Sequence, residues 1–154
     1  MFKEKNKAQN RNKRPHGKAK PPKCPYCGKK SKLEDSSEVY SKSYGLIYLC
    51  KDCNAYVGVH KGTKIPLGRL ANEVLRRKKR VAHYYFDFLW NRKIEKENCS
   101  RRKARYAAYK WLAECLEISK NKCHIGMFDE ETCEKVVEVC KPHVLRIKAA
   151  LNIA

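Results

Sequence analysis

The sequence predicts an α+β fold, in which a small β-rich module precedes a domain of three or four helices. Two cysteine pairs of equal spacing, "CPYC" at Cys24 and "CKDC" at Cys50, frame the first part of the chain. Strand-like segments lie between and after them, and from Leu67 onward the apolar residues recur at helical spacing. We therefore divide the 154 residues into the ranges 1–22, 23–66 and 67–154, of which the last is the helical domain.

Residues 1–22 are predicted to be a disordered basic arm. Residues 1–23 hold nine Lys and Arg against a single acid, Glu4, and have few apolar side chains to bury. Such a segment cannot offset the entropy that ordering costs. The whole chain has 36 Lys and Arg against 16 Asp and Glu, a formal net charge of +20, and residues 24–154 carry +12 of it. The body of the protein is therefore basic without its arm.

The sequence predicts a soluble, intracellular protein without membrane contact. No apolar run approaches the roughly 18 residues that a spanning helix needs, and no apolar segment follows the charged start. In a reducing compartment, nine cysteines indicate metal ligands or free thiols rather than disulfides.

The middle range, 23–66, is expected to form three strands, in residues 33–41, 44–50 and 55–60. The first helix is expected to begin at Leu67, with Pro66 in its first turn, and to run for about six turns.

Two further helices are indicated by their capping residues. Ser100 is predicted to cap the second helix, and Asp129 the third. Phe128 and Cys133 stand at the two positions of a hydrophobic staple around the Asp129 cap. Pro142 is expected to interrupt the third helix and to leave a short final helix or a frayed tail after it.

Four cysteines are the candidate metal ligands: Cys24, Cys27, Cys50 and Cys53. A C-x-x-C turn brings two thiolates within reach of one cation, and the residue after it often needs a left-handed backbone, which Gly28 and Asn54 reach cheaply. The 22 residues between the two motifs suit a hairpin that brings them face to face. The sequence thus predicts one zinc ion, and four thiolates leave no open position, so the ion is structural. Two unrelated cysteine pairs are the alternative, but the strand–helix context of a redox motif is absent.

A second group of metal donors is a weaker possibility: Cys123, His124, Cys133, Cys140 and His143. Cys133 and Cys140 lie seven residues apart on the apolar stripe of one helix, where buried core cysteines are the commoner explanation. Cys99 and Cys115 are expected to be incidental thiols.

Basic residues gather in three places and are the candidate nucleic-acid contacts: Lys61 and Lys64; Arg69, Arg76, Arg77, Lys78, Lys79 and Arg80; and Arg101, Arg102 and Arg105. Five consecutive cations cannot all face solvent on one side of a helix, so some must reach out from the packed face. Cations at the start of a helix oppose its dipole, and phosphate binding would use that placement. We expect the three groups to converge on one groove. The alternative is a solvated surface, and no stacking residue is assigned.

Three segments of the chain resemble a known family: "YVGVHKGTKIPLGRLAN", "AHYYFDFLW" and "CHIGMFDEETC". They are similar to zinc-finger-containing proteins encoded by phages and prophages, and the resemblance runs from about Cys24 to Cys140. By this similarity, the four cysteines of the two C-x-x-C motifs match the finger cysteines of the family. The resemblance implies zinc and a bacterial or viral setting, and thus the cytoplasm of a bacterial host cell. It implies no activity.

Together these patterns predict a zinc-stabilised, basic, nucleic-acid-binding protein of phage type, acting on DNA or RNA. The alternative is an interaction module that inhibits or modulates an acidic host protein, such as the ribosome, another ribonucleoprotein or a defence enzyme. A metal-dependent nuclease would need clustered histidines and carboxylates, for which the residues to consider are His60, His83, Asp87, His124 and Asp129. Asp87 is expected to pair with a neighbouring Arg and Asp129 to act as a cap. No catalytic residue is assigned, and the sequence favours a protein that is not an enzyme.

Overall fold

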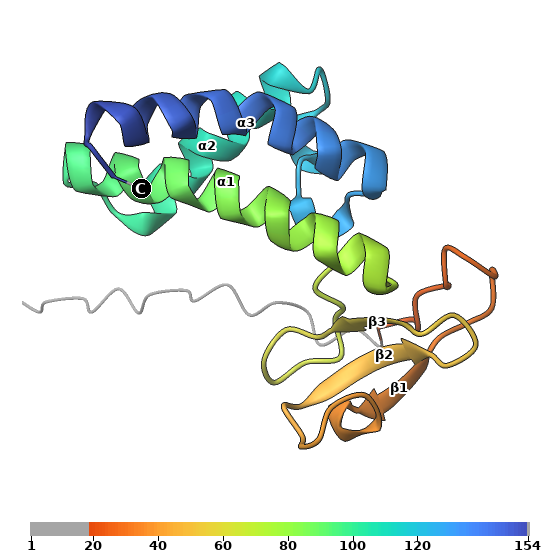
Figure 1. The fold of residues 1–154 in the computed structure, drawn as a ribbon. Coiled ribbons are helices and arrows are strands. Elements are labelled where there is room, and N and C mark those ends of the chain that lie inside the picture. Colours follow the sequence, from red (N-terminus) through yellow and green to blue (C-terminus); the bar gives the residue numbers. More distant parts are fainter. Residues whose placement is uncertain (1–18, 154) are drawn as a thin grey trace, which may run out of the picture.

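The α+β fold is confirmed: a three-stranded antiparallel sheet is followed by three helices (Figure 1). The structure is a computed structural model and describes residues 19–153, so most of the predicted basic arm lies outside the described residues. The sheet contains β1 (Lys32–Asp35), β2 (Leu46–Cys50) and β3 (Ala55–Gly58). The helices are α1 (Glu73–Glu97), α2 (Arg101–Cys115) and α3 (Glu130–Ala150).

The sheet has the order β1-β2-β3, and one of its faces builds a small core. Tyr48 lies opposite both Leu33 and Val57, so these three side chains share that face. Tyr48 is buried there together with Leu70 and Ala55. The predicted strand over 33–41 is wrong beyond Asp35, since residues Ser36–Glu38 form a 3₁₀ turn. The Asp35 carboxylate accepts the Ser37 N–H at 2.9 Å, which caps this turn and bends the chain out of the sheet.

Residues 67–72 form a strap without helical structure between the sheet and α1, and the predicted helix start at Leu67 is wrong. The Leu67 N–H donates to the Gly58 carbonyl, and Ala71 pairs with Tyr56 through two hydrogen bonds. Strand β3 thus forms hydrogen bonds with backbone groups that would otherwise have to pair within the first turn of a helix. Helix α1 begins only after Asn72, whose side chain accepts the Leu75 N–H at 3.0 Å.

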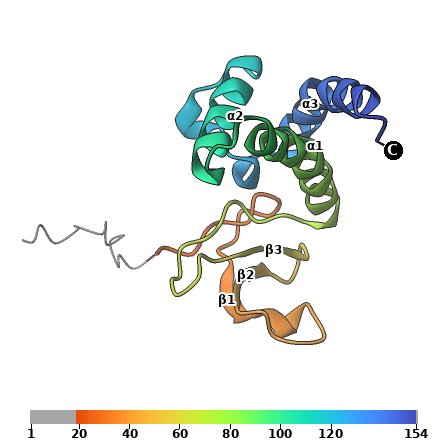
Figure 2. The same ribbon diagram turned by 90° about the vertical axis from the view of Figure 1, so that its left-hand side faces the viewer.

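Helix α1 lies between α2 and α3 and provides the centre of the second, larger core (Figure 2). Phe86, Leu112 and Val136 come from the three helices in turn and are fully buried. The predicted caps are confirmed: Ser100 accepts the Lys103 N–H, and Asp129 accepts the Thr132 N–H. Phe128 and Cys133, the predicted staple, are both buried.

Helix α3 continues through Pro142 to Ala150, so the predicted interruption is wrong. Pro142 is exposed, whereas Cys140 and Val144 on either side of it are fully buried in the core. Burial of residues before and after the proline outweighs the hydrogen bond that its missing N–H forfeits. Among the residues described, no helix is long and apolar enough to cross a membrane.

Candidate metal centre

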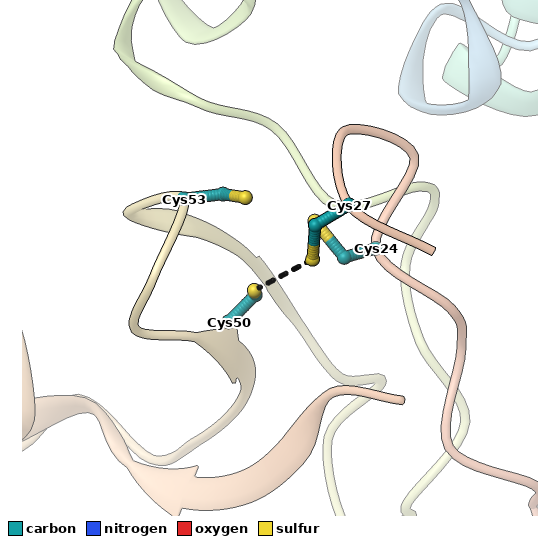
Figure 3. A group of neighbouring side chains, drawn as sticks. All are labelled: Cys24, Cys27, Cys50 and Cys53. Carbon is teal, nitrogen blue, oxygen red and sulfur yellow. Dashed lines mark hydrogen bonds between the residues drawn. The ribbon is translucent and has the colours of Figure 1, made fainter. Parts of the chain in front are cut away.

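The four predicted cysteines meet at one point, at the end of β2 where the chain turns toward β3 (Figure 3). Their Sγ atoms all lie within 4.8 Å of one another, and those of Cys27 and Cys50 are 3.6 Å apart. Tetrahedral zinc with Zn–S bonds of about 2.3 Å places its sulfurs roughly 3.8 Å apart. The spacing of the four sulfurs therefore fits a single tetrahedral zinc ion.

Each C-x-x-C motif is shaped by the residue that follows it. Gly28 has φ of +73° and Asn54 has φ of +46°, which confirms the left-handed backbone predicted at both positions. The Gly28 N–H donates to the Cys24 carbonyl at 2.9 Å, and the Asn54 N–H to the Lys51 carbonyl at 3.2 Å. These bonds close each turn so that both of its cysteines face the same side. The same geometry is strained for residues other than glycine and asparagine.

The electrostatics of the cluster show why these sulfurs require a cation. Burial opposes ionisation of Cys24, but the N–H groups of Tyr26 and Cys27 outweigh it and lower the pKa of that thiol. Burial raises the pKa of Cys50. Burial and then the three neighbouring thiols raise the pKa of Cys53 to about 12. Thiolates this close repel one another, and a bound divalent cation removes that repulsion while holding all four deprotonated.

The cluster sits on a module with a small core of its own. Cys24 and Cys50 are buried beside Tyr48, Ala55 and Leu70. An exposed salt bridge, from Lys29 two residues after the first motif to Asp52 in the second, joins the two turns at 2.6 Å and adds little by itself. A core of this size supplies too little folding energy, so metal binding must supply the rest.

A closed tetrathiolate site on a three-stranded sheet defines a zinc-ribbon protein in which the metal is structural. The cluster offers sulfur ligands alone and no open coordination position. In a comparison with protein families, a family model described as a zinc-finger-containing domain matches residues 20–143. The chain belongs to this family. No curated protein and no solved structure matched the chain.

The remaining cysteines and histidines do not form a second centre within residues 19–153. Cys133 and Cys140 are fully buried in the helical core, as predicted. Burial raises the pKa of Cys133 to about 11 and that of Cys140 to about 12, which keeps both protonated. His124 packs against Tyr109, and His143 against Trp111. These residues are core thiols and ring contacts.

The predicted basic residues of α1 serve several internal contacts. The Arg76 guanidinium lies 4.1 Å from the ring centroid of Tyr56 and donates to the Asn54 and Ala71 carbonyls. Lys78 pairs with Glu130 and Glu134 of α3, and Arg77 with Glu73. The half-buried Lys79 and the backbone of Arg69 both donate to the Gly126 carbonyl. Lys79 thus holds its ammonium against the turn that contains Gly126 instead of reaching out to solvent from the packed face, as this run was predicted to do.

The other predicted contacts lie elsewhere on the molecule. Arg101 and Arg105 lie against the Trp90 ring, at 5.2 and 5.7 Å from its centroid. Trp90 is fourteen residues beyond Arg76, which is roughly 21 Å along the helix axis. Arg101 and Arg105 of α2 thus lie beside a part of α1 that is well separated from Arg76, and the convergence of the three basic groups on one groove stays a prediction. Arg102, Lys61 and Lys64 are exposed.

Two contacts were not predicted from the sequence. Asp87 accepts the Trp90 indole N–H at 2.7 Å and lies 3.6 Å from His83, so the expected pairing with an arginine is wrong. Arg76 and Tyr56 are twenty positions apart in the sequence, and no local sequence pattern predicts their contact. Only the docking of α1 on the sheet brings these two side chains together.

Proposed function

We propose that this protein is a zinc-stabilised nucleic-acid-binding protein. The observation that carries the proposal is its net charge of +20, of which +12 falls on residues 24–154. An excess of this size cannot be neutralised by internal ion pairs, and it favours the binding of an external polyanion. Nucleic acid presents phosphates at the density that such a surface fits, and binding releases its counterions.

The start of α2 supports this reading. Its first turn contains Arg101, Arg102 and Lys103 and no acidic residue. The helix dipole makes cations unfavourable there, so the sequence loses stability at this point. Phosphate groups would recover the loss, because both the cations and the free N–H groups at the helix start attract them. Membership of the zinc-finger-containing family is compatible with this role. The resemblance to phage and prophage proteins further favours a phage-type protein in a bacterial cytoplasm.

The test is the salt dependence of binding. Fluorescence anisotropy with labelled single-stranded and duplex oligonucleotides should give affinities for the full, zinc-loaded chain that fall tenfold or more between about 50 and 200 mM salt. The double variant Arg102→Gln/Lys103→Gln should lower the log–log salt slope on duplex by up to about 1.8, since each neutralised phosphate contributes about 0.9. Its thermal midpoint should rise, because the cations opposing the helix dipole are gone.

The matched control is Lys135→Gln/Lys141→Gln, which removes the same charge from α3. Lys135 already pairs with Glu131 at 2.7 Å. This variant should change the affinity less than the α2 variant does. Absence of binding to any oligonucleotide at about 50 mM salt would refute the proposal. An acidic protein retained after nuclease treatment would then identify the competing role.

A further inference from the structure

Three tyrosines form a connected cluster on the surface of the zinc ribbon, where it meets α1. The ring centroids of Tyr40 and Tyr44 are 5.6 Å apart, and those of Tyr40 and Tyr56 are 5.8 Å apart, both edge to face. The Tyr40 hydroxyl donates to the Tyr56 hydroxyl at 2.9 Å. Tyr44 is 69% exposed and Tyr40 44% exposed, so both rings are accessible to a ligand.

The loop that carries Tyr40 and Tyr44 is held in place, and Tyr56 lies on strand β3. The buried Ser36 hydroxyl accepts the Tyr44 N–H at 2.6 Å, and the Ser36 N–H donates to the Gly45 carbonyl. The Asp35 carboxylate accepts both the Ser37 N–H and the Ser43 hydroxyl. Tyr40 and Tyr44 are thus presented on a preorganised loop, so a ligand that stacks on them would lose little entropy in ordering it.

Cations border the cluster on both sides. The Lys42 ammonium lies 5.2 Å from the Tyr44 ring centroid, and the Arg76 guanidinium 4.1 Å from that of Tyr56. Arg80, one helical turn beyond Arg76, is exposed and close enough to act electrostatically on the Tyr56 hydroxyl. The nearest acid on the loop besides Asp35 is Glu38, and it is paired with Lys51 at 2.6 Å. Exposed rings and cations therefore lie side by side.

We propose that Tyr40, Tyr44 and Tyr56, with Lys42, Arg76 and Arg80, form a stacking platform for the unpaired bases of single-stranded nucleic acid. The inference rests on the proposed function and names the form of nucleic acid that this surface takes. Tyr44 is the most exposed of the three rings, and the exposed cations Lys42 and Arg80 are placed for the adjoining phosphates, while Arg76 holds the Tyr56 ring in position. Single-stranded DNA and RNA share this chemistry.

The single strand is favoured over the duplex because of what the rings can reach. In a duplex the faces of the bases are stacked on one another, and only their edges and the phosphates are accessible. Exposed aromatic faces on a basic surface gain from contact with unstacked bases, which every base can provide. The platform should therefore discriminate strand state and show little preference for base sequence.

The test compares two tyrosines with matched surroundings. Tyr44→Leu keeps an apolar side chain of similar size but removes the ring. Tyr106→Leu is the control, since Tyr106 is 61% exposed on α2 and also lies under a lysine, Lys120. Anisotropy is measured with labelled oligothymidylate, oligouridylate and a duplex, each about 12 nucleotides long, at one fixed salt concentration.

Tyr44→Leu should weaken binding to one or both single strands about tenfold, as expected for the loss of one stacked base. Duplex affinity should stay unchanged, because tyrosine carries no charge and its ring cannot stack on the paired bases of a duplex. Tyr44→Phe, which keeps the ring, should bind with wild-type affinity. The oligothymidylate and oligouridylate arms show whether DNA or RNA is the preferred ligand.

The inference is overturned, with the proposed function intact, if the wild type binds but Tyr44→Leu leaves both single-strand affinities unchanged. The same conclusion follows if the duplex affinity falls by the same factor, or if only Tyr106→Leu weakens binding. Failure of the wild type to bind any of the three oligonucleotides overturns the proposed function itself. Zinc content and circular dichroism of each variant show that the fold is retained.

Discussion

The Lys79 ammonium lies half-buried between α1 and the 3₁₀ turn Ile125–Met127, where it donates to the Gly126 carbonyl at 2.6 Å. Burial is the main cause that lowers the pKa of Lys79 from 10.5 to about 8, and the charge of Arg69 adds to the effect. Nucleic acid cannot reach this ammonium as easily as an exposed one. Lys79 is therefore better explained as a residue that stabilises the packing of α1 against the turn containing Gly126 than as a phosphate contact.

This pKa makes stability depend on pH in a predictable direction. Between about pH 8 and pH 10.5 the unfolded chain binds the Lys79 proton more tightly than the folded chain, so this residue makes the free energy of unfolding rise with pH. Lys79→Met should remove that contribution. The wild-type free energy of unfolding minus that of the variant should rise over this window, by at most about 1.4 kcal/mol per pH unit. Urea unfolding at stepped pH measures it.

Lys78→Met is the control for that experiment. Hydrogen bonds with Glu134, chiefly, raise the pKa of Lys78 above 10.5, so its contribution is present throughout the window and is lost only at higher pH. The free energy of unfolding of the wild type minus that of Lys79→Met could instead be independent of pH, as expected for Lys78→Met. That result would show that Lys79 is not desolvated in the folded protein.

At the residue level, the sequence predicted what local geometry determines. The left-handed positions Gly28 and Asn54 follow from the needs of a C-x-x-C turn, and the Ser100 and Asp129 caps from the needs of a helix start. The contact of Arg76 with Tyr56 and the burial of Lys79 could not be predicted, because each depends on how separate elements dock.

At the level of elements, the errors fall where a backbone segment had two possible partners. Residues 67–72 have a helical apolar pattern, yet their N–H and carbonyl groups pair with β3 and with Gly126. Pro142 ordinarily ends a helix, yet Cys140 and Val144 are buried on both sides of it. In both cases tertiary packing overrides local propensity.

The folding of the zinc ribbon should depend on its metal. Cys50→Ser removes one of four sulfurs, and apparent folding energy on the order of 10 kcal/mol depends on that site. We expect the zinc content, measured by elemental analysis, to fall from one ion per chain to well below one. The helical signal of α1, α2 and α3 should largely persist, since these helices share a separate core.

Cys115→Ser provides the comparison. Cys115 is an exposed thiol at the end of α2, outside the cluster. This variant should retain a full zinc ion. Stoichiometric zinc in Cys50→Ser as well would contradict the assignment of the four ligands.

At the level of the whole molecule, the ribbon and the helices are joined by a contact between two glycine backbones. A Cβ added to Gly68 would lie 2.1 Å from the Gly126 carbonyl oxygen, and one added to Gly126 would lie 3.0 Å from the Leu67 oxygen. The close approach lets the Gly126 carbonyl accept the Arg69 N–H at 3.1 Å. Two of the segments that carry the family resemblance, "YVGVHKGTKIPLGRLAN" and "CHIGMFDEETC", thus meet here.

Gly68→Ala should therefore push the two modules apart. The methyl group meets backbone that cannot move aside, and overpacking of this kind costs about 1–3 kcal/mol. We expect denaturant unfolding, followed both by helical circular dichroism and by zinc release to a metal-binding dye, to show two separated transitions. The wild type should show coincident ones.

Gly58→Ala is the matched substitution in this case. Its added Cβ would meet the end of the Leu67 side chain at 3.2 Å, and a flexible side chain can shift by a few tenths of an ångström. Its unfolding curves should remain coincident and close to those of the wild type. Equal damage from the two substitutions would mean that the glycine contact has no special part in joining the modules.

Two neighbouring residues at the end of the strap, Leu70 and Ala71, belong to different cores, and this sets where the chain can be cut. Leu70 points into the ribbon core, whereas the next residue, Ala71, belongs to the helical core. A ribbon fragment that stops at residue 66 would lose Leu70 and the strand partner of Tyr56. An independently folding ribbon must therefore extend through residue 71, and a helical fragment that begins later would expose the surface that Ala71 covers.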